Sequence, residues 1–202
     1  LDAWISSNTT PPPSRHARLD DGTAVPSESL RSVFQSFPGV GFPDHLRHLY
    51  RLDYGPRDGI VENLPPVTGN PYPALVSNVD QDGNDVAGIR LPDVSVPLAS
   101  VPGWNLRHPD TGGPGQTHKT MGSTLPFAFT KQERQDTSDP RPSIEERYAS
   151  REDYLDRVET AAQDLASERY LLEEDVPRIS EMAGERYDLL ESRVKEAQPA
   201  GD

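Results

Sequence analysis

The chain has 202 residues and a formal net charge of −13, and about one fifth of its residues are Leu, Ile, Val or Phe. This acidity argues against nucleic acid as a partner, because phosphate binding requires a basic surface. The absence of cysteine excludes disulfides, zinc–thiolate sites and thiol catalysis. No apolar stretch reaches the ~20 residues that a membrane span needs.

The composition changes near residue 142. Of the 21 prolines, all but two lie in residues 1–142, whereas residues 143–202 are strongly acidic. Proline interrupts long regular elements because it lacks a backbone donor. We therefore expect one domain of loops and short strands over 1–142 and a second, helical domain over 143–202. The predicted fold class is α+β, with a small antiparallel β-hairpin sheet followed by a C-terminal αα-hairpin.

The first predicted element is a short helix at the start of the chain. Leu1, Trp4 and Ile5 have the i, i+3, i+4 spacing of one helical face. The polar and proline-rich residues 6–13 end this helix after about one turn, which cannot nucleate alone. We therefore interpret it as the last turn of a longer helix and the chain as a fragment of a longer protein. The same spacing recurs over 44–52, where a second short helix is expected.

Strands are predicted in the middle of the chain. Residues 73–79 and 86–91 are two apolar runs separated by a polar turn that contains Asp82 and Gly83. An Asp-Gly pair between apolar runs favours a hairpin, because glycine adopts a positive φ without a Cβ clash. Residues 94–98 alternate apolar side chains with serine and proline, which predicts a third, edge strand.

The acidic region is predicted to contain two helices. Ser143 with Glu146 fits a capping box, in which each side chain satisfies a backbone donor of the first turn. Ser150 with Asp153 repeats this pattern. Two apolar stripes follow, formed by Tyr154, Leu155, Val158, Ala161, Ala162 and Leu165, and by Val176, Ile179, Met182, Ala183, Tyr187, Leu190 and Val194. A short connection between such helices makes an αα-hairpin.

No residue of the sequence can be assigned to catalysis or to metal binding from a motif. The α/β-hydrolase nucleophile needs Gly-x-Ser-x-Gly, and no serine of the chain has glycine two places before it. His45 and His48 share a helical spacing, but no carboxylate cluster in the sequence completes a metal site. His108 and His118 lie in a glycine-rich loop without a visible partner for general-base catalysis. No catalytic residue, metal or cofactor is therefore expected.

The segment 103–107 (GWNLR) is the candidate substrate-binding site. It follows a predicted strand and precedes a glycine-rich loop. Trp104 can form an apolar pocket wall, and Asn105 and Arg107 can fix the polar groups of a ligand. In the alternative interpretation, Trp104 is a core residue and Arg107 bonds loop carbonyls. The sequence leaves both interpretations open.

Several stretches carry a resemblance to a known family. They are residues 4–19 (WISSNTTPPPSRHARL), 21–23 (DGT), 52–56 (LDYGP), 79–107 (VDQDGNDVAGIRLPDVSVPLASVPGWNLR), 139–148 (DPRPSIEERY) and the helices over 150–187. Together they resemble the C-terminal part of the mostly bacterial alpha/beta hydrolase domain-containing proteins, which are longer chains. Residues 79–107 are the most specific of these stretches.

The resemblance implies that the parent is a hydrolase or esterase. It also implies that the nucleophilic serine and the catalytic histidine lie upstream of Trp4, so that the partner of this chain is a missing N-terminal hydrolase core with a small-molecule substrate of open class. The chain then supplies a lid, a pocket wall or a supporting layer, and whether it is itself an enzyme stays open. The alternative is a non-catalytic structural or protein-interaction module. The sequence indicates no particular compartment.

Overall fold

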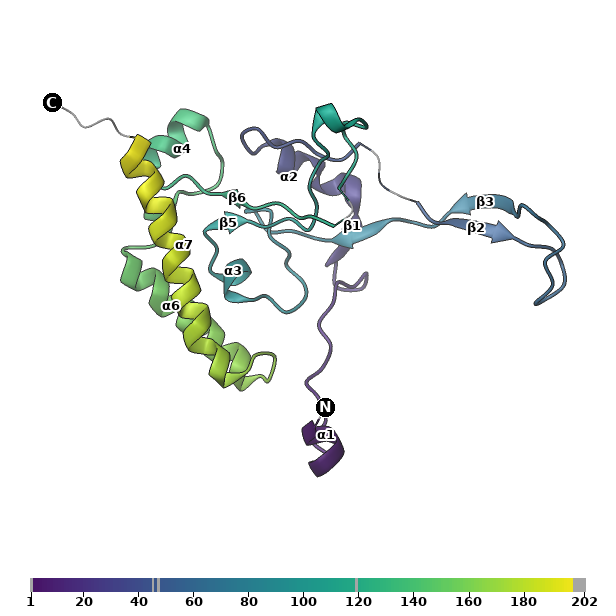
Figure 1. Ribbon diagram of the computed structural model, residues 1–202, viewed down its shortest axis with the longest axis horizontal. Coiled ribbons are helices and arrows are strands. Elements are labelled where there is room, and N and C mark those ends of the chain that lie inside the picture. The colour runs from purple at the N-terminus through teal and green to yellow at the C-terminus, as the bar shows by residue number, and fades with distance from the viewer. Residues whose placement is uncertain (1, 45, 47, 119, 198–202) are drawn as a thin grey trace.

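The structure, a computed structural model, describes residues 2–44, 46, 48–118 and 120–197 (Figure 1). Its two long helices, α6 (Arg151–Ser167) and α7 (Val176–Ala197), lie side by side along one flank of the molecule. The shorter helices are α1 (Asp2–Ser7), α2 (Arg31–Gln35), α3 (Pro92–Ser95), α4 (Lys131–Thr137) and α5 (Ile144–Arg147). None of the helices within these ranges has the length and apolar composition to cross a membrane.

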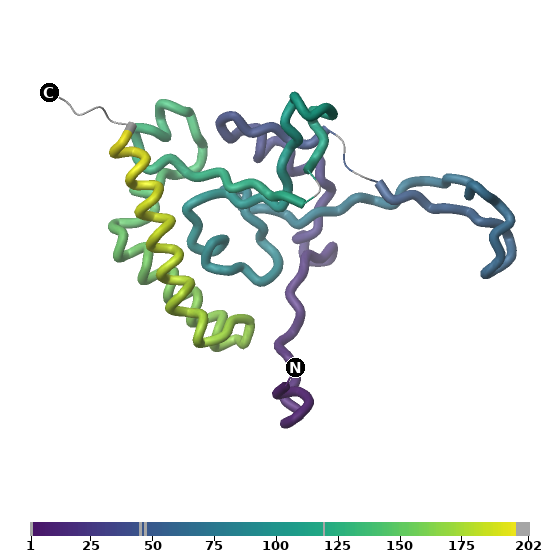
Figure 2. The backbone as a smooth tube through the Cα atoms, in the orientation of Figure 1, coloured from purple at the N-terminus to yellow at the C-terminus, as the bar shows by residue number. Residues whose placement is uncertain are grey.

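The strands form three two-stranded antiparallel sheets. The pairs are β1 (Ala24–Pro26) with β4 (Leu75–Ser77), β2 (Tyr50–Asp53) with β3 (Val67–Pro71), and β5 (Ala99–Ser100) with β6 (Leu125–Pro126). Small antiparallel sheets followed by a helical hairpin confirm the predicted α+β class. The chain path in Figure 2 shows that β2 and β3 project away from the other elements as a separate ribbon.

The prediction of a short helix over 44–52 is wrong. Strand β2 begins at Tyr50, and the described residues before it are irregular. The Leu49 carbonyl accepts from the backbone N–H of Tyr72, 2.8 Å away, so this segment pairs with the chain after β3. Leu49 is 77% exposed. Of the three apolar residues with helical spacing, Leu46 is half-buried, whereas Leu49 and Tyr50 are exposed, so the spacing does not form a buried helical face. His45, one of the two histidines considered as metal ligands, lies outside the described residues.

The Asp-Gly turn is present, but the strands around it differ from the prediction. The backbone N–H of Gly83 donates to the Asp80 carbonyl, 3.0 Å away, and Gly83 has a φ of 78°. Strand β4 pairs with β1, far away in sequence, and residues 86–91 form no strand. A turn signal fixes a local reversal of the chain, but the partner of a strand depends on contacts distant in sequence.

The edge strand expected over 94–98 is also wrong, because residues 92–95 form helix α3. Pro92 occupies the first helical position, where its fixed φ suits a helix and its missing N–H costs no hydrogen bond. The backbone N–H groups of Val94 and Ser95 both donate to the Leu91 carbonyl, at 2.8 and 3.0 Å. The local proline geometry prevails over the alternating pattern.

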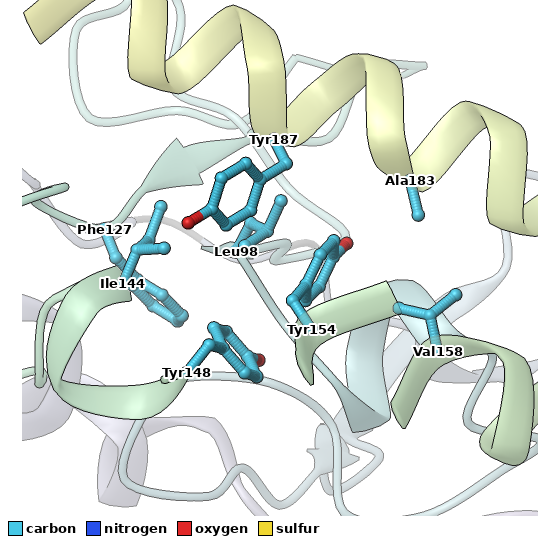
Figure 3. Close-up of a cluster of buried hydrophobic side chains, with 8 residues drawn as sticks. All are labelled: Leu98, Phe127, Ile144, Tyr148, Tyr154, Val158, Ala183 and Tyr187. Atoms are coloured by element: carbon cyan, nitrogen blue, oxygen red, sulfur yellow. The ribbon is translucent and has the colours of Figure 1, made fainter. Parts of the chain in front are cut away.

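The helical hairpin follows the prediction closely. The backbone N–H of Ser143 donates to Glu146, 3.0 Å away, which completes a capping box at the start of α5. The Ser150 hydroxyl accepts from the backbone N–H of Asp153 at the start of α6. Tyr154 and Val158 then point into a core cluster whose members are labelled in Figure 3: Leu98, Phe127, Ile144, Tyr148, Tyr154, Val158, Ala183 and Tyr187.

This helical core draws on both compositional regions. Leu98 and Phe127 precede residue 142, and the other members follow it. A second cluster, the aromatic core, consists of Leu30, Phe34, Phe37 and Phe42. The division into domains at 1–142 and 143–202 remains a prediction, but the two regions share one buried core.

Candidate functional site

The candidate segment 103–107 is extended and lies beside a neighbouring segment of its own loop. Leu106 forms an antiparallel bridge with Thr117. The backbone N–H of Arg107 donates to the Gln116 carbonyl at 2.9 Å, and the Asn105 carbonyl accepts from His118 at 2.7 Å. Backbone pairing therefore holds three consecutive residues of the segment in a defined conformation.

Trp104 anchors this segment in the aromatic core. Its indole packs edge-on against Phe34 and Phe42, with ring centroids 5.1 and 5.7 Å apart. Edge-to-face contacts of this kind stabilise aromatic clusters beyond their area burial. Trp104 is only partly buried, so the uncovered part of its indole remains available as an apolar wall.

Asn105 and Arg107 belong to the other face of the segment. Successive side chains of an extended chain point to opposite sides. Leu106 approaches Gly41 and therefore shares the face of Trp104. One terminal guanidinium nitrogen of Arg107 donates to the Thr111 carbonyl at 3.1 Å. Among the described residues, its other donors and the Asn105 amide group make no hydrogen bond, so two polar side chains are presented side by side.

The glycine-rich loop that follows makes a close backbone approach. Gly115 has a φ of 80°, and its carbonyl accepts from the backbone N–H of Asp44, 2.9 Å away. A Cβ at this position would lie 2.6 Å from a carboxylate oxygen of Asp44. Only glycine satisfies both conditions. The loop is therefore fixed against the chain near the aromatic core.

A buried amide fixes the strand that leads into the candidate segment. The fully buried Asn84 side chain donates to the Ala99 carbonyl at 3.1 Å and accepts from the backbone N–H of Val101 at 2.8 Å. Its amide thus pairs with the backbone of β5 as a neighbouring strand would. The fully buried Ser100 hydroxyl donates to the Asp82 carbonyl. These bonds tie the 82–84 turn to β5.

Arg141 extends this buried polar network. It is 4% exposed, donates to the Ser100 hydroxyl at 2.7 Å, and forms an ion pair with Asp139 at 2.6 Å. Its guanidinium lies 4.4 Å from the ring centroid of Phe37 and 5.1 Å from that of Phe127. Arg141 therefore joins the aromatic core to the helical core through a fully paired charge.

A second ion pair, which is partly buried, completes the junction. Arg147 donates to a carboxylate oxygen of Asp82 at 2.8 Å, and its guanidinium lies 4.1 Å from the ring centroid of Phe127. Sequence reasoning missed both ion pairs. The only signal for them was that residues 79–107 and 139–148 both resemble the same family, and the structure brings these two stretches together. The junction made by Asp82, Asn84, Ser100, Asp139, Arg141 and Arg147 is called the polar junction below.

Burial changes the pKa of Tyr148 and of Asp85. Burial raises the pKa of Tyr148 to about 12, and its hydroxyl donates to the Pro97 carbonyl at 2.9 Å. Desolvation raises the pKa of the Asp85 carboxyl. The neutral tyrosine is a structural donor of the helical core.

Surface hollows on the described part of the chain include two that lie away from the candidate segment. One, of about 310 Å³, is lined by Ser14, Arg15, His16, Arg18, Asp21, Thr23, Val86, Ala87 and Gly88. The other, of about 290 Å³, lies on α6 between Asp156 and Asp164. Neither is lined by the candidate residues. The carboxylates Glu168 and Asp20 pair with Arg15 and Arg18, so the cations of the first hollow are already neutralised.

The other side chains considered for chemistry serve the loop. The Ser123 hydroxyl donates to the Trp104 carbonyl at 2.9 Å. The exposed His108 ring lies 3.5 Å from the Asp110 carboxylate and accepts from the Asp110 backbone. The described residues contain no group of three or more histidine, cysteine or carboxylate side chains that could hold a metal ion.

Comparison with known proteins places the chain in a family. No curated protein and no solved structure matches it. The family described as "Alpha/beta hydrolase domain" matches residues 1–181, which is most of the chain and includes the aromatic core, most of the helical core, the candidate segment and the polar junction. The chain therefore belongs to the alpha/beta hydrolase domain family.

Proposed function

We propose that this chain supplies a pocket wall and its supporting layer to the active site of an esterase-like alpha/beta hydrolase. In this proposal the catalytic nucleophile belongs to a hydrolase core outside these 202 residues. Asn105 and Arg107 bind the substrate's carbonyl or carboxylate oxygens, and Trp104 anchors their segment and contributes an apolar wall. The family membership supports hydrolysis as the reaction of the whole protein.

The free donors of Arg107 are the observation that carries this proposal. One guanidinium nitrogen is held by the Thr111 carbonyl, which orients the group, and the remaining donors have no partner among the described residues. An oriented guanidinium binds carboxylates and carbonyls with charge-assisted hydrogen bonds. The polar junction fixes the preceding strand β5, so that the segment approaches a ligand in a defined position.

The test is Arg107→Ala in the hydrolase that contains this chain together with its core. We expect kcat/KM to fall by about 10- to 100-fold, because a charge-assisted hydrogen bond contributes ~1.5–3 kcal/mol. Arg107→Lys keeps the positive charge but loses the planar guanidinium. Its kcat/KM should lie between the values of the unmodified protein and of Arg107→Ala. The proposal is wrong if Arg107→Ala unfolds the protein while the surviving folded fraction keeps full activity.

The chain by itself should not hydrolyse esters. The sequence contains no Gly-x-Ser-x-Gly turn to expose a serine nucleophile. The purified chain is assayed on p-nitrophenyl acetate and butyrate and exposed to a fluorophosphonate probe. We expect no turnover above buffer and no labelled serine. Stoichiometric labelling of one serine would contradict the placement of the nucleophile elsewhere.

A further inference from the structure

Strands β2 and β3 form a two-stranded ribbon, and every residue of the two strands is exposed. It extends away from the rest of the molecule (Figures 1 and 2). Between residues 49 and 72 it carries a group of large apolar side chains that are all exposed: Leu49, Tyr50, Leu52, Tyr54, Ile60, Val61, Leu64, Val67 and Tyr72. An isolated two-stranded ribbon is at best marginally stable in water. The ribbon therefore needs a partner surface.

The two open edges of the ribbon differ. The register pairs Tyr50 with Pro71 and Leu52 with Thr68, so one residue of β2 opposes two of β3. The extra residue belongs to β3, which also contains Gly69 and Pro71. A bulge and a proline both protect an edge against pairing with another strand. Strand β2 is regular and has neither device.

The outer edge of β2 is complementary to itself. In an antiparallel pair of two β2 strands with Leu52 on the two-fold axis, Arg51 lies opposite Asp53 of the second copy. The symmetry repeats this ion pair and brings the two Leu52 side chains together. Opposite charges and apolar pairs across strands are each stabilising. The pairs that this register forms within β2 are therefore favourable.

The charged side chains of this edge, Arg51 and Asp53, can form further ion pairs and hydrogen bonds. Among the described residues, Arg51 forms no ion pair, and its guanidinium lies 5.3 Å from the ring centroid of Tyr72. The Asp53 carboxylate accepts one hydrogen bond among the described residues, from the backbone N–H of Gly55 at 2.8 Å, and forms no ion pair with them. An interface through this edge would add interactions to both groups without breaking an existing ion pair.

We propose that a second copy of this chain pairs with the outer edge of β2, giving a four-stranded antiparallel sheet in the order β3, β2, β2, β3. The contact is isologous, since the same edge meets itself across a two-fold axis, and this is the commonest arrangement of protein dimers. The remaining elements of the two copies then lie at opposite ends of the shared sheet, because the two β2 strands are antiparallel and each ribbon projects from the other elements of its own chain.

Charge reversal at the edge tests the proposal. Sedimentation velocity of the 202-residue chain, measured across about 1 μM to 1 mM, should show a monomer–dimer equilibrium. Arg51→Asp and Asp53→Arg each replace two attractive pairs with two repulsive ones. Each should raise the dimer dissociation constant by about tenfold or more. The double variant Arg51→Asp/Asp53→Arg restores both ion pairs with their polarity exchanged and should dimerise like the unmodified chain.

The control is Asp58→Arg, which makes the same change of charge on the exposed tip of the same ribbon, outside β2. It should leave the dissociation constant within about twofold of the unmodified chain. A chain that stays monomeric over the whole range overturns the proposal and leaves the ribbon to a different partner, such as the hydrolase core. A dimer that is indifferent to both single reversals, or that the double variant fails to restore, also overturns it.

Discussion

The chain contains two hairpins that differ in how much of their surface is buried. The α6–α7 hairpin buries its apolar stripe in the helical core, where Tyr154 is 2% exposed. The β2–β3 ribbon has its own backbone pairing, and every residue of its two strands is exposed. The helical hairpin therefore draws its stability from tertiary contacts, whereas the ribbon has only its cross-strand bonds. Satisfied backbone hydrogen bonds alone do not show that a hairpin is in its functional environment.

The largest expected effect contrasts one tyrosine from each hairpin. Tyr154→Ala should lower the free energy of unfolding by about 4 kcal/mol, because it empties a site enclosed by Tyr148 and Tyr187. Tyr50→Ala on the ribbon should change it by less than ~0.5 kcal/mol at concentrations where the chain is monomeric. Urea titrations followed by circular dichroism measure both. Equal losses for the two variants would contradict the contrast.

The polar junction gives the next effect. Arg141→Met should destabilise the chain by about 3 kcal/mol, because it leaves the Asp139 carboxylate buried without its cation. Adding Asp139→Asn should restore part of this loss, since the unpaired charge is then removed. Thermal unfolding of the two variants tests this coupling. Additive losses in the double variant would show that the ion pair does not act as a unit.

The start of α6 gives a smaller effect. Ser150→Ala should cost about 1 kcal/mol, because the hydroxyl accepts from the backbone N–H of Asp153. Ser167→Ala, in the last turn of the same helix, removes only a bond to the Asp164 carbonyl and serves as the matched control. Its effect on the urea midpoint should be less than half as large. A reversed order would contradict the capping assignment.

Acid should lower the stability of the helical hairpin but should not unfold it. Arg157 holds the pKa of Asp153 below its ordinary value of 3.8, and Arg151 does the same for Asp188. These carboxylates therefore stabilise the fold above the ordinary value, and their contribution is lost as the pH falls through the lowered one. Desolvation raises the pKa of Asp85, which gives the opposite dependence. The melting temperature should fall between about pH 5 and pH 2, and Asp188→Asn should reduce that fall. A melting temperature that is constant over this interval would contradict the assignment.

Local signals predicted the parts of the structure that depend on local chemistry. The capping box at Ser143, the N-cap at Ser150 and the turn at Gly83 lie where the sequence placed them. The pairing of β4 with β1 and the formation of α3 in place of an edge strand were not predicted. Strand pairing depends on contacts between segments about 50 residues apart, which periodicity does not encode.

The candidate segment shows the same limit. Sequence reasoning selected Trp104, Asn105 and Arg107 by residue type and offered a binding and a structural interpretation. The contact of Arg107 with Thr111 agrees with the structural one, and its free donors leave room for binding. The ion pair between Asp82 and Arg147 joins residues far apart in the chain, and no motif pointed to it.

Gly83 has a consequence for the chemical ageing of the protein. Asp-Gly bonds are among the peptide bonds that rearrange readily to isoaspartate, through attack of the following backbone nitrogen on the aspartate carboxyl group. Asp21-Gly22 and Asp58-Gly59 are exposed, whereas Asp82 is 6% exposed and held by Arg147. A Cβ at Gly83 would lie 2.8 Å from the ring of Phe37, so close packing favours glycine at this position. The same packing shields the Asp82-Gly83 peptide bond from rearrangement. Isoaspartate at position 82 would therefore accumulate only in molecules that have opened, and its amount would record how often the protein unfolds.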